Sequence, residues 1–290
     1  MLIRLFGLTN PTGDYLYKKI IKEDFSDIYC YSRYCKEYNI LDINKNNFDN
    51  LKKICNKEEI WISMCPIWIF NTFMNNLIKV NLNKKFNIKA IICCSSTSII
   101  TKKYSWHNYD KELIEKINIA ENNLIAISNE NKYYLSIIRT SMVYGNSGKY
   151  LDKNLNRIIN IIRKIPFLIL PKSTGKRQPI HISQLSNIIY KDLKDIIENN
   201  NLRKNPIINV GGDQTLTYKD IVISLLKKKA IIKPILYIEN NLFFLILSPL
   251  ILVNSRFYSE ILRLNSDLSG FNKTYQVLNQ EYIKFVDLIE

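Results

Sequence analysis

The first 22 residues form an apolar run, a glycine-bounded turn and a helical segment, and this pattern constrains the fold more than any other feature. Leu2 to Phe6 has the length of a short strand, and Asp14 to Lys22 carries apolar residues at helical spacing. The turn between them reads Gly7-Leu8-Thr9-Asn10-Pro11-Thr12-Gly13. The chain has only eight glycines, so two of them at the ends of one turn indicate a backbone task that other residues perform poorly.

Further apolar runs of strand length alternate with segments of helical spacing. The expected strands are Asp27 to Tyr31, Ile60 to Met64, Ile88 to Cys94 and Leu135 to Arg139. The expected helices between them are Phe48 to Asn56, Ile67 to Ile78 and Lys111 to Ser128. Such alternation predicts parallel βαβ units. Right-handed crossovers then give an α/β fold with a Rossmann-like doubly wound parallel sheet, covered by helices on both faces.

After about residue 145 the rhythm changes to helix, loop and short strand. The expected elements here are Leu155 to Lys164, Gln184 to Glu198, Ile207 to Val210 and Tyr218 to Lys228. We expect residues 1–150 to form the Rossmann part and residues 151–290 a smaller mixed α/β lobe interleaved with it, in one continuous body. No linker-like stretch separates the two parts.

Composition excludes several classes of protein. The six cysteines lie in the first third of the chain without the spacing of a zinc site, so no metal site is expected, and Cys93 and Cys94 are interpreted as small buried hydrophobes. The N-terminus lacks the flanks of a signal peptide, which favours a cytoplasmic location. A formal charge of +15, spread along the chain without dense basic blocks, favours an anionic small molecule or membrane surface over nucleic acid.

The most apolar segment, Leu242 to Val253, allows two interpretations. Its twelve residues are too few to span a bilayer, which requires about 20. It is either a buried core helix or an interfacial segment at the inner face of the membrane, followed by Arg256 and Arg263. Both interpretations stay open at this point.

The turn after the first strand indicates a phosphate-binding site. A Rossmann protein brings its backbone close to a pyrophosphate at this place and directs the helix N-terminus at the negative charge. The turn resembles the GxxGxxG turn of the extended short-chain dehydrogenase/reductases, the family of the nucleotide-sugar epimerases and dehydratases, with Asn10 at the middle glycine. Asn tolerates a left-handed backbone. The resemblance implies that Gly7, Asn10, Pro11, Thr12 and Gly13 bind the cofactor; the alternative is a plain βα turn that binds nothing.

The end of the second expected strand indicates which dinucleotide is preferred. NAD-specific proteins place an acidic residue there, whereas this chain has Ser32-Arg33. A guanidinium beside a small hydroxyl suits a 2′-phosphate, so NADP is favoured over NAD, unless Arg33 is an ordinary surface residue. The resemblance also implies a contact between Asp42 and the adenine edge.

The expected catalytic positions depart from the family. Ser95 to Ser98 resembles the family's Ser/Thr run, in which Thr97 would bind the substrate hydroxyl, but the Tyr-x-x-x-Lys pair is absent. Counting back from Arg139, which opens a stretch similar to the family's R-P-x-x-x-Y-G, places the pair at Glu112 and Lys116. The alternative is an exposed salt bridge between these two. Tyr104 and Tyr109 are substitutes for the missing tyrosine.

The resemblance continues through the substrate side. It implies substrate contacts from Thr140, Ser141 and Tyr144, from Asn154, and from Arg177, whose planar guanidinium suits a diphosphate. His181 lies between two isoleucines, which is typical of a core histidine rather than a catalytic base.

Two functional hypotheses follow. The first is an NAD(P)-dependent epimerase or dehydratase that acts on a nucleotide-diphosphate or polyprenyl-diphosphate sugar by transient hydride transfer. The second is a non-catalytic NADP-binding scaffold or redox sensor. An RNA-associated relative is a weaker third hypothesis, and a homodimer is left open.

Overall fold

The centre of the molecule is an eight-stranded parallel sheet. The structure, a computed structural model, describes residues 1–289 except 24, 26, 44–47, 49, 50, 52–56, 254–263 and 265. The strand order is β14-β11-β6-β5-β4-β1-β2-β3, and every neighbouring pair is parallel. The strands are β1 (Leu2–Phe6), β2 (Ile28–Ser32), β3 (Asn39–Ile40), β4 (Glu59–Ser63), β5 (Ile88–Ser96), β6 (Tyr134–Thr140), β11 (Ile207–Gly211) and β14 (Asn272–Lys273). The predicted doubly wound α/β fold is confirmed.

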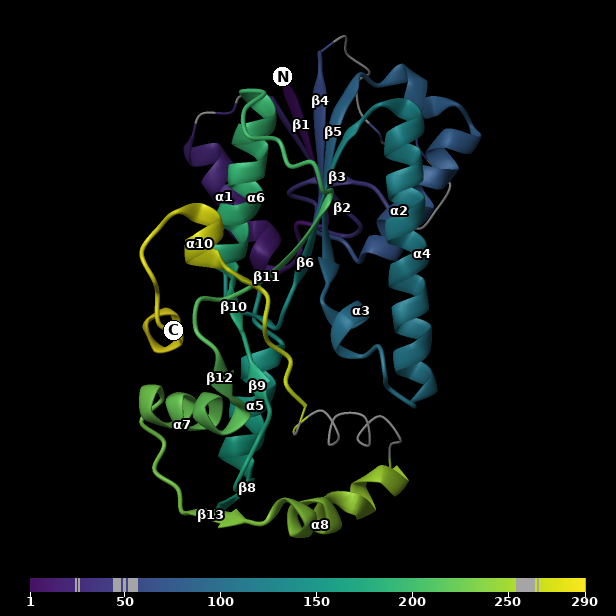
Figure 1. The fold of residues 1–290 in the computed structure, drawn as a ribbon. Helices are drawn as coiled ribbons and strands as arrows, with labels where there is room; N and C mark the ends of the chain where they lie inside the picture. The colour runs from purple at the N-terminus through teal and green to yellow at the C-terminus, as the bar shows by residue number, and fades with distance from the viewer. Residues whose placement is uncertain are drawn as a thin grey trace.

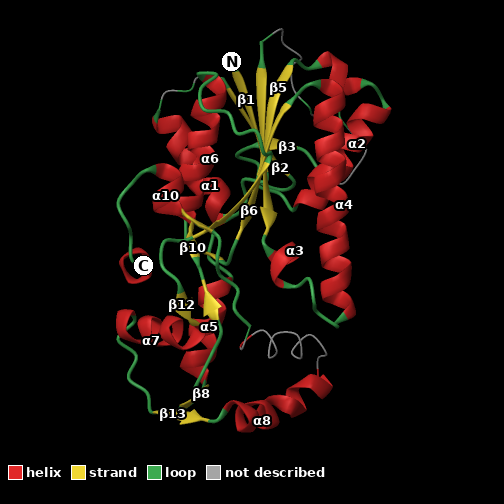
Figure 2. Ribbon diagram, viewed as in Figure 1, coloured by secondary structure: helices red, strands yellow, loops and turns green. Residues whose placement is uncertain are grey.

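Helices cover both faces of this sheet (Figures 1 and 2). On one face lie α1 (Pro11–Lys22), α6 (Ile182–Ile197) and the short α10 (Thr274–Leu278), and on the other lie α2 (Ile67–Lys79) and α4 (Asn108–Asn131). Each face has its own apolar core. Leu16 and Leu185 belong to the first core, and Phe70 and Leu124 to the second; all four are fully buried. Short elements connect the main ones: η1 (Leu82–Lys85) and α3 (Ser98–Thr101).

The expected elements of the sheet layer agree with the observed ones to within a few residues. The largest extensions are of three residues, at the start of α1 and at both ends of α4. Helix α4 begins at Asn108, where the His107 ring accepts a hydrogen bond from the Tyr109 backbone N–H. The expected helix at Phe48 to Asn56 falls largely outside the described residues, as do Cys55, Arg256 and Arg263.

A second layer of structure lies beyond the carboxyl ends of the central strands (Figure 1). It has its own apolar clusters, in which Ile159 and Leu225, and Ile162 and Leu168, are buried. Its elements are β7 (Val143–Tyr144), α5 (Asn154–Lys164), β8 (Leu168–Pro171), β9 (Lys176–Arg177), β10 (Ile180–His181), β12 (Leu216–Thr217), α7 (Tyr218–Lys228), β13 (Ile235–Ile238), α8 (Asn240–Val253) and η2 (Phe285–Leu288). After β10 the chain returns to the sheet through α6 and β11.

The apolar segment expected at Leu242 to Val253 is helical in α8. One side chain of this helix, Phe243, is buried, while Leu242, Leu245 and Ile246 are exposed, so α8 is not a fully buried core helix. Among the described residues, no helix combines the length and apolarity that a membrane span requires.

A buried ion pair lies inside the sheet and connects β1, β2 and β4. Arg4 donates through Nε to Glu59 at 2.7 Å and through a terminal nitrogen to the Tyr31 hydroxyl at 2.6 Å. Trp61 donates its indole N–H to the same Glu59 carboxylate at 2.7 Å. Both charged side chains are completely buried. They compensate each other's charge in an interior that would not accept either one alone.

Candidate functional site: two cavities beside the first turn

Gly7 and Gly13 are both required by the packing of the first turn. Gly7 has φ +78°, and a Cβ there would lie 2.6 Å from Cys65 Sγ. A Cβ at Gly13 would lie 2.9 Å from Leu8 Cα and 3.0 Å from the Gly7 carbonyl oxygen. The first glycine therefore makes the tight turn, and the last allows helix α1 to pack against the strand, which are two of the three tasks of a dinucleotide-binding glycine motif.

Asn10 occupies the position of the middle glycine and fills the inside of the turn with its side chain. Its Oδ1 accepts a hydrogen bond from the Gly13 N–H at 2.9 Å, and its Nδ2 donates to the Gly7 carbonyl at 2.6 Å. The residue is extended, with φ −144° and ψ 162°, so the expected tolerance of a left-handed backbone is not used. Asn10 is instead the N-cap of α1. One N–H that could face a phosphate is thereby bonded within the protein.

The first turn of α1 also offers fewer donors than a usual anion site. Pro11 stands at its start and has no N–H. Asp14 places a carboxylate in the same turn, where it accepts hydrogen bonds from Ser147 Oγ and Lys18 Nζ, each at 2.6 Å. A negative charge is favourable at a helix N-terminus, so the Asp14 carboxylate already interacts with the positive end of the α1 dipole and reduces its attraction for a phosphate. The turn retains the geometry of a dinucleotide site with a reduced capacity for phosphate.

A cavity of about 540 Å³ lies beside this turn, at the carboxyl ends of β1, β2, β4 and β5. Its volume is in the range of small-molecule sites, and it lies where the strand order reverses. Its lining includes Gly7, Thr9, Asn10, Tyr31, Ser32, Arg33, Leu41, Ile43, Cys65, Ser95, Ser96, Ile117 and Lys153. The cavity thus brings together Gly7 and Asn10 from the first turn with Ser32 and Arg33 from the end of β2. The other predicted cofactor residues are not among its lining residues: Pro11, Thr12, Gly13 and Asp42.

Ser32 and Arg33, at the end of β2, both line this cavity. The Ser32 hydroxyl accepts a hydrogen bond from the Cys35 N–H at 3.1 Å, which fixes the turn after β2. Arg33 is exposed, and its guanidinium carbon lies 5.3 Å from the centre of the Tyr34 ring. Asp42 is half-buried between Leu41 and Ile43, and these two neighbours line the cavity.

The face of α4 that reaches the smaller cavity is apolar. Ile117 lines the cavity, and Leu113, one turn earlier, packs against the adjoining core. Glu112 and Lys116 each precede these residues by one position and are exposed to solvent. A shift of one residue turns a helical side chain by about 100°, so the expected catalytic pair points away from the cavity.

The Ser/Thr run after β5 is bonded within the protein. Thr97 is buried and donates its hydroxyl to the Thr140 carbonyl at 3.1 Å, and Thr140 donates its own to the Ser95 carbonyl at 3.2 Å. Ser95 donates to Glu121 at 2.6 Å, and Arg139 forms an ion pair with the same carboxylate. Thr97 and Thr140 therefore connect β5 to β6, and of the run from Ser95 to Ser98 only Ser95 and Ser96 line the smaller cavity.

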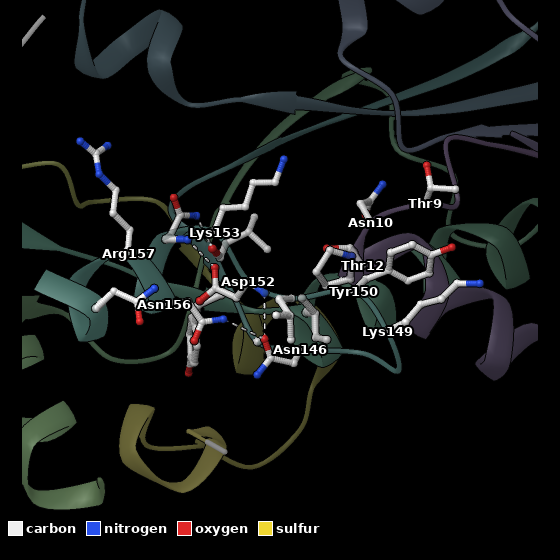
Figure 3. A pocket seen from close by; sticks show the side chains of 18 of the residues that line it. Thr9, Asn10, Thr12, Asn146, Lys149, Tyr150, Asp152, Lys153, Asn156 and Arg157 are labelled. Atoms are coloured by element: carbon white, nitrogen blue, oxygen red, sulfur yellow. Dashed lines mark hydrogen bonds between the residues drawn. The ribbon is translucent and has the colours of Figure 1, made fainter. Parts of the chain in front are cut away.

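A second, larger cavity of about 1110 Å³ adjoins the first on the other side of the turn. Thr9, Asn10 and Lys153 line both cavities. The rest of its lining mixes polar and basic residues with apolar ones. The polar and basic residues include Thr12, Tyr144, Asn146, Lys149, Tyr150, Asp152, Asn154, Asn156, Arg157 and Lys164, and the apolar ones are Pro11, Val143, Leu151, Ile161 and Ile182. Figure 3 shows Lys153 and Arg157 on one side of Asp152 and Asn146, and Lys149 with Tyr150 on the other, near Thr12.

Asp152 and Asn146 fix the basic residues by capping α5. Asp152 accepts hydrogen bonds from the backbone N–H groups of Asn154 at 2.7 Å and Leu155 at 2.8 Å, and its own N–H donates to Asn146 Oδ1 at 2.8 Å. Burial raises the pKa of Asp152, while the backbone hydrogen bonds at the start of the helix lower it. The cap holds Lys153 and Arg157 on the first turn of α5, at the border of the two cavities.

The predicted substrate residues divide into two groups. Tyr144 and Asn154 line the larger cavity, and the Asn154 side chain donates to the Val143 carbonyl at 2.6 Å. Ser141 donates to the Gln178 carbonyl, and Arg177 is buried, donating to the carbonyls of Lys176 and Ser266. Neither Ser141 nor Arg177, nor Thr140, is among the residues that line the two cavities.

His181 caps α6, as a structural histidine would. Its Nδ1 accepts from the Ser183 N–H at 3.2 Å, and its backbone N–H donates to the Gln184 side chain at 3.1 Å. Burial lowers its pKa to about 4. Its Nε2 is buried with no hydrogen-bond partner among the described residues. The interpretation of His181 as a core residue agrees with this position.

None of the four basic residues of the larger cavity was predicted from the sequence as a site residue: Lys164 and, at a spacing of four residues, Lys149, Lys153 and Arg157. This spacing is a signal for a common face, although only Arg157 and Lys153 belong to the start of a helix. Among the described residues, no group of His, Cys, Asp and Glu side chains is arranged to hold a metal ion.

Comparison with known proteins supports the fold. No family model matches the chain, and no curated protein matches it. A mutant UDP-glucuronic acid 4-epimerase from Bacillus cereus, solved with NAD and a fluorinated UDP-sugar, has a TM-score of 0.69 at 13% identity, covering 99% of this chain and 96% of that one.

Two further solved structures are similar. GDP-mannoheptose C4 reductase from Campylobacter jejuni, with NADP bound, gives a TM-score of 0.65 at 12% identity, over 99% of this chain and 95% of that chain. UDP-N-acetylglucosamine 4-epimerase from Bacillus cereus gives 0.61 at 17% identity, over 82% and 86%. The chain has the Rossmann-like fold of these sugar epimerases and reductases, as its resemblance to the extended short-chain dehydrogenase/reductases predicts.

Proposed function

We propose that the 540 Å³ cavity binds a nicotinamide dinucleotide and that the adjoining basic cavity binds a diphosphate-linked sugar. The observation that supports this most is the meeting of the two cavities at Thr9, Asn10 and Lys153, at the carboxyl ends of the parallel strands. A redox enzyme with two ligands needs such a border, because the reacting atoms of both have to meet. The neighbours in fold include an epimerase solved with NAD and a UDP-sugar and a reductase solved with NADP.

The lining of the smaller cavity suits a dinucleotide along its length. Leu41 and Ile43 offer an apolar surface for the adenine, Gly7 and Thr9 lie at the middle, and Ser96 and Ile117 lie at the far end for the nicotinamide. When bound, the nicotinamide ring supplies a site for reversible hydride transfer. The residues of the chain bind and orient it, and Asn10 weakens the phosphate contact by bonding the Gly13 N–H.

We expect NADP to bind more tightly than NAD. Arg33 lines the cavity next to the Ser32 hydroxyl, and the turn after β2 presents no carboxylate to this cavity. A guanidinium forms charge-assisted, bidentate hydrogen bonds with phosphate, which the 2′-phosphate of NADP offers and NAD lacks. Substitution of Arg33 by Ala is expected to remove the preference.

The larger cavity suits a ligand with two phosphates. Lys149, Lys153, Arg157 and Lys164 give it four basic side chains against the single carboxylate of Asp152, which the α5 cap uses. Lys149 is also paired with the exposed Glu37 at 2.8 Å. A sugar diphosphate carried by a nucleotide or by a polyprenyl chain presents the same anionic group, so the two carriers are compared in the experiment.

A second candidate function, cofactor binding without turnover, is favoured by the apolar face of α4. The neighbouring side chains on that face, Leu113 and Ile117, carry no proton donor or acceptor, whereas the family's pair provides a tyrosine and a lysine there. Proton transfer by a positioned group contributes a factor of about 10² to 10⁴ to the rate. A protein whose α4 presents this apolar face keeps its binding sites but loses most of the rate contribution of proton transfer.

The test combines binding with turnover. Calorimetric titration with NADPH, NADH, a UDP-sugar and a polyprenyl-diphosphate sugar measures the sites separately, and oxidation of NADPH in the presence of each sugar measures hydride transfer. Lys153→Ala is expected to weaken sugar binding about tenfold, since a charge-assisted hydrogen bond is lost. Lys116→Ala, an exposed lysine of α4, is the matched control and is expected to leave binding unchanged. Binding without NADPH oxidation would select the second candidate, and a protein that binds neither ligand would refute both.

A further inference from the structure

Helix α8 lies at the end of the lobe furthest from the sheet (Figure 1), and several of its apolar side chains are exposed to solvent. Leu242, Leu245 and Ile246 lie on one side of it, at spacings of three and one residues, and are 48%, 68% and 46% exposed. Pro249, also exposed, extends the same side by one turn. Residues 240–253 contain no charged side chain. A helix that is apolar on all faces is expected to be covered on all faces.

Among residues 240–249 of α8, whose side chains the structure describes, the lobe covers only one side. Phe243 is buried, and the helix packs against β8. Phe167, which directly precedes β8, and Leu236, in the strand β13 that pairs with β8, are also exposed, by 49% and 55%. An exposed apolar patch of this kind marks an interaction surface.

The excess of basic over acidic residues in the lobe favours an anionic partner. Residues 153–172 and 218–253 contain ten lysines and arginines and two acids, Asp220 and Glu239. Three of the ten, Lys153, Arg157 and Lys164, line the larger cavity, and Glu239 is paired with Lys172. The remaining basic residues still outnumber the acids. An exposed apolar helix on such a basic support matches a membrane surface that carries anionic headgroups over an apolar interior. A second copy of this basic chain would have to overcome the repulsion between like charges.

We propose that α8 docks this protein on an anionic lipid surface, with Leu242, Leu245 and Ile246 inserted at the boundary between headgroups and acyl chains. The helix lies in the plane of the surface, because its 14 residues are too few to cross a bilayer, which requires about 20. The basic side chains of the lobe contact the headgroups. The proposal goes beyond the binding of cofactor and sugar and does not depend on either.

The experiment is co-sedimentation of the full chain with vesicles of phosphatidylcholine, alone or with about one third phosphatidylglycerol. Binding is expected only to the anionic vesicles, and it is expected to fall at about 0.5 M salt because the charges are then screened. The triple variant L242N/L245N/I246N is expected to bind at least tenfold more weakly, since each side chain loses its apolar transfer energy. The control is Ile119→Asn, which removes an apolar side chain that is 50% exposed on α4. Its binding should equal that of the native chain.

A second variant distinguishes weaker membrane binding from a loss of the native fold. Leu245→Trp keeps the face apolar, and its fluorescence is expected to shift to shorter wavelength on addition of anionic vesicles, whereas that of Ile119→Trp is not. Three results would overturn the proposal: no sedimentation with anionic vesicles, undiminished binding of the triple variant with no shift for Leu245→Trp, or a native dimer in solution that the triple variant converts to monomer. The last result would assign the surface to self-association.

Discussion

Replacement of Asn10 by glycine should strengthen cofactor binding while it weakens the fold. The Asn10 side chain accepts from the Gly13 N–H at 2.9 Å and donates to the Gly7 carbonyl at 2.6 Å. Asn10→Gly removes both bonds and restores the glycine pattern of the resembling family. The Gly13 N–H then becomes available to a phosphate oxygen.

The two effects have opposite signs and similar size. Loss of an Asn cap to Gly costs a few tenths of a kcal/mol, and loss of the second hydrogen bond about 1 kcal/mol, so unfolding should become easier by about 1 to 1.5 kcal/mol. A hydrogen bond to a charged group contributes about 1.5 to 3 kcal/mol, and 1.4 kcal/mol is a factor of ten in affinity. NADPH should therefore bind at least about tenfold more tightly to the variant.

Calorimetric titration gives the affinity, and urea unfolding without ligand gives the stability. Asn10→Asp is the matched control, because aspartate keeps the cap but adds a negative charge where the phosphates are expected. Because aspartate cannot donate to the Gly7 carbonyl, unfolding should become easier by about 1 kcal/mol or more, as in Asn10→Gly, but NADPH should bind more weakly than to the native chain. If Asn10→Gly, properly folded, binds NADPH no better than the native chain does, the phosphates do not lie at this turn.

Three further predictions concern the fold and the site. Arg4→Met should lower the free energy of unfolding by about 3 to 5 kcal/mol, because it leaves Glu59 charged and buried; urea unfolding of the single variant and of R4M/E59L should show that the double variant recovers part of the loss. The pKa of His181 is lowered by burial to about 4, so the unfolded chain, with a pKa near 6.5, binds the proton first and stability falls as the pH drops from about 6.5 to about 4. His181→Asn keeps a capping side chain and should remove a pH-dependent loss on the order of 3 kcal/mol over that interval; an unchanged profile in pH-dependent unfolding would contradict the assignment. Gly13→Ala should destabilise the fold by about 1 to 3 kcal/mol, since its Cβ would lie 2.9 Å from Leu8 Cα; a thermal midpoint equal to that of the native chain would show that the turn has room.

The sheet was predictable because its strands are buried on both faces and read as continuous apolar runs. The bounds of two expected strands, Ile60 to Met64 and Ile88 to Cys94, differ from those of the observed strands by at most two residues. The turn at Gly7 was predicted from the position of two glycines in a chain that has few. Local pattern is sufficient where burial and backbone geometry both restrict the residue type.

The site was less predictable because it depends on helix register and on hydrogen bonds between distant segments. Counting residues placed the expected pair at Glu112 and Lys116, one position away from the face that Ile117 presents to the cavity. Arg177 has the right chemistry for a diphosphate, but its guanidinium donates to the carbonyls of Lys176 and Ser266. Ser266 lies 89 positions after Arg177 in the sequence. No local pattern specifies such a contact.

The central claim is that the cavity beside the Gly7 turn holds a nicotinamide dinucleotide, and titration of the native chain with NADPH and NADH tests it most directly. The account predicts saturable binding of one dinucleotide per chain, tighter for NADPH, with the preference lost in Arg33→Ala. A native, folded chain that binds neither coenzyme would contradict it.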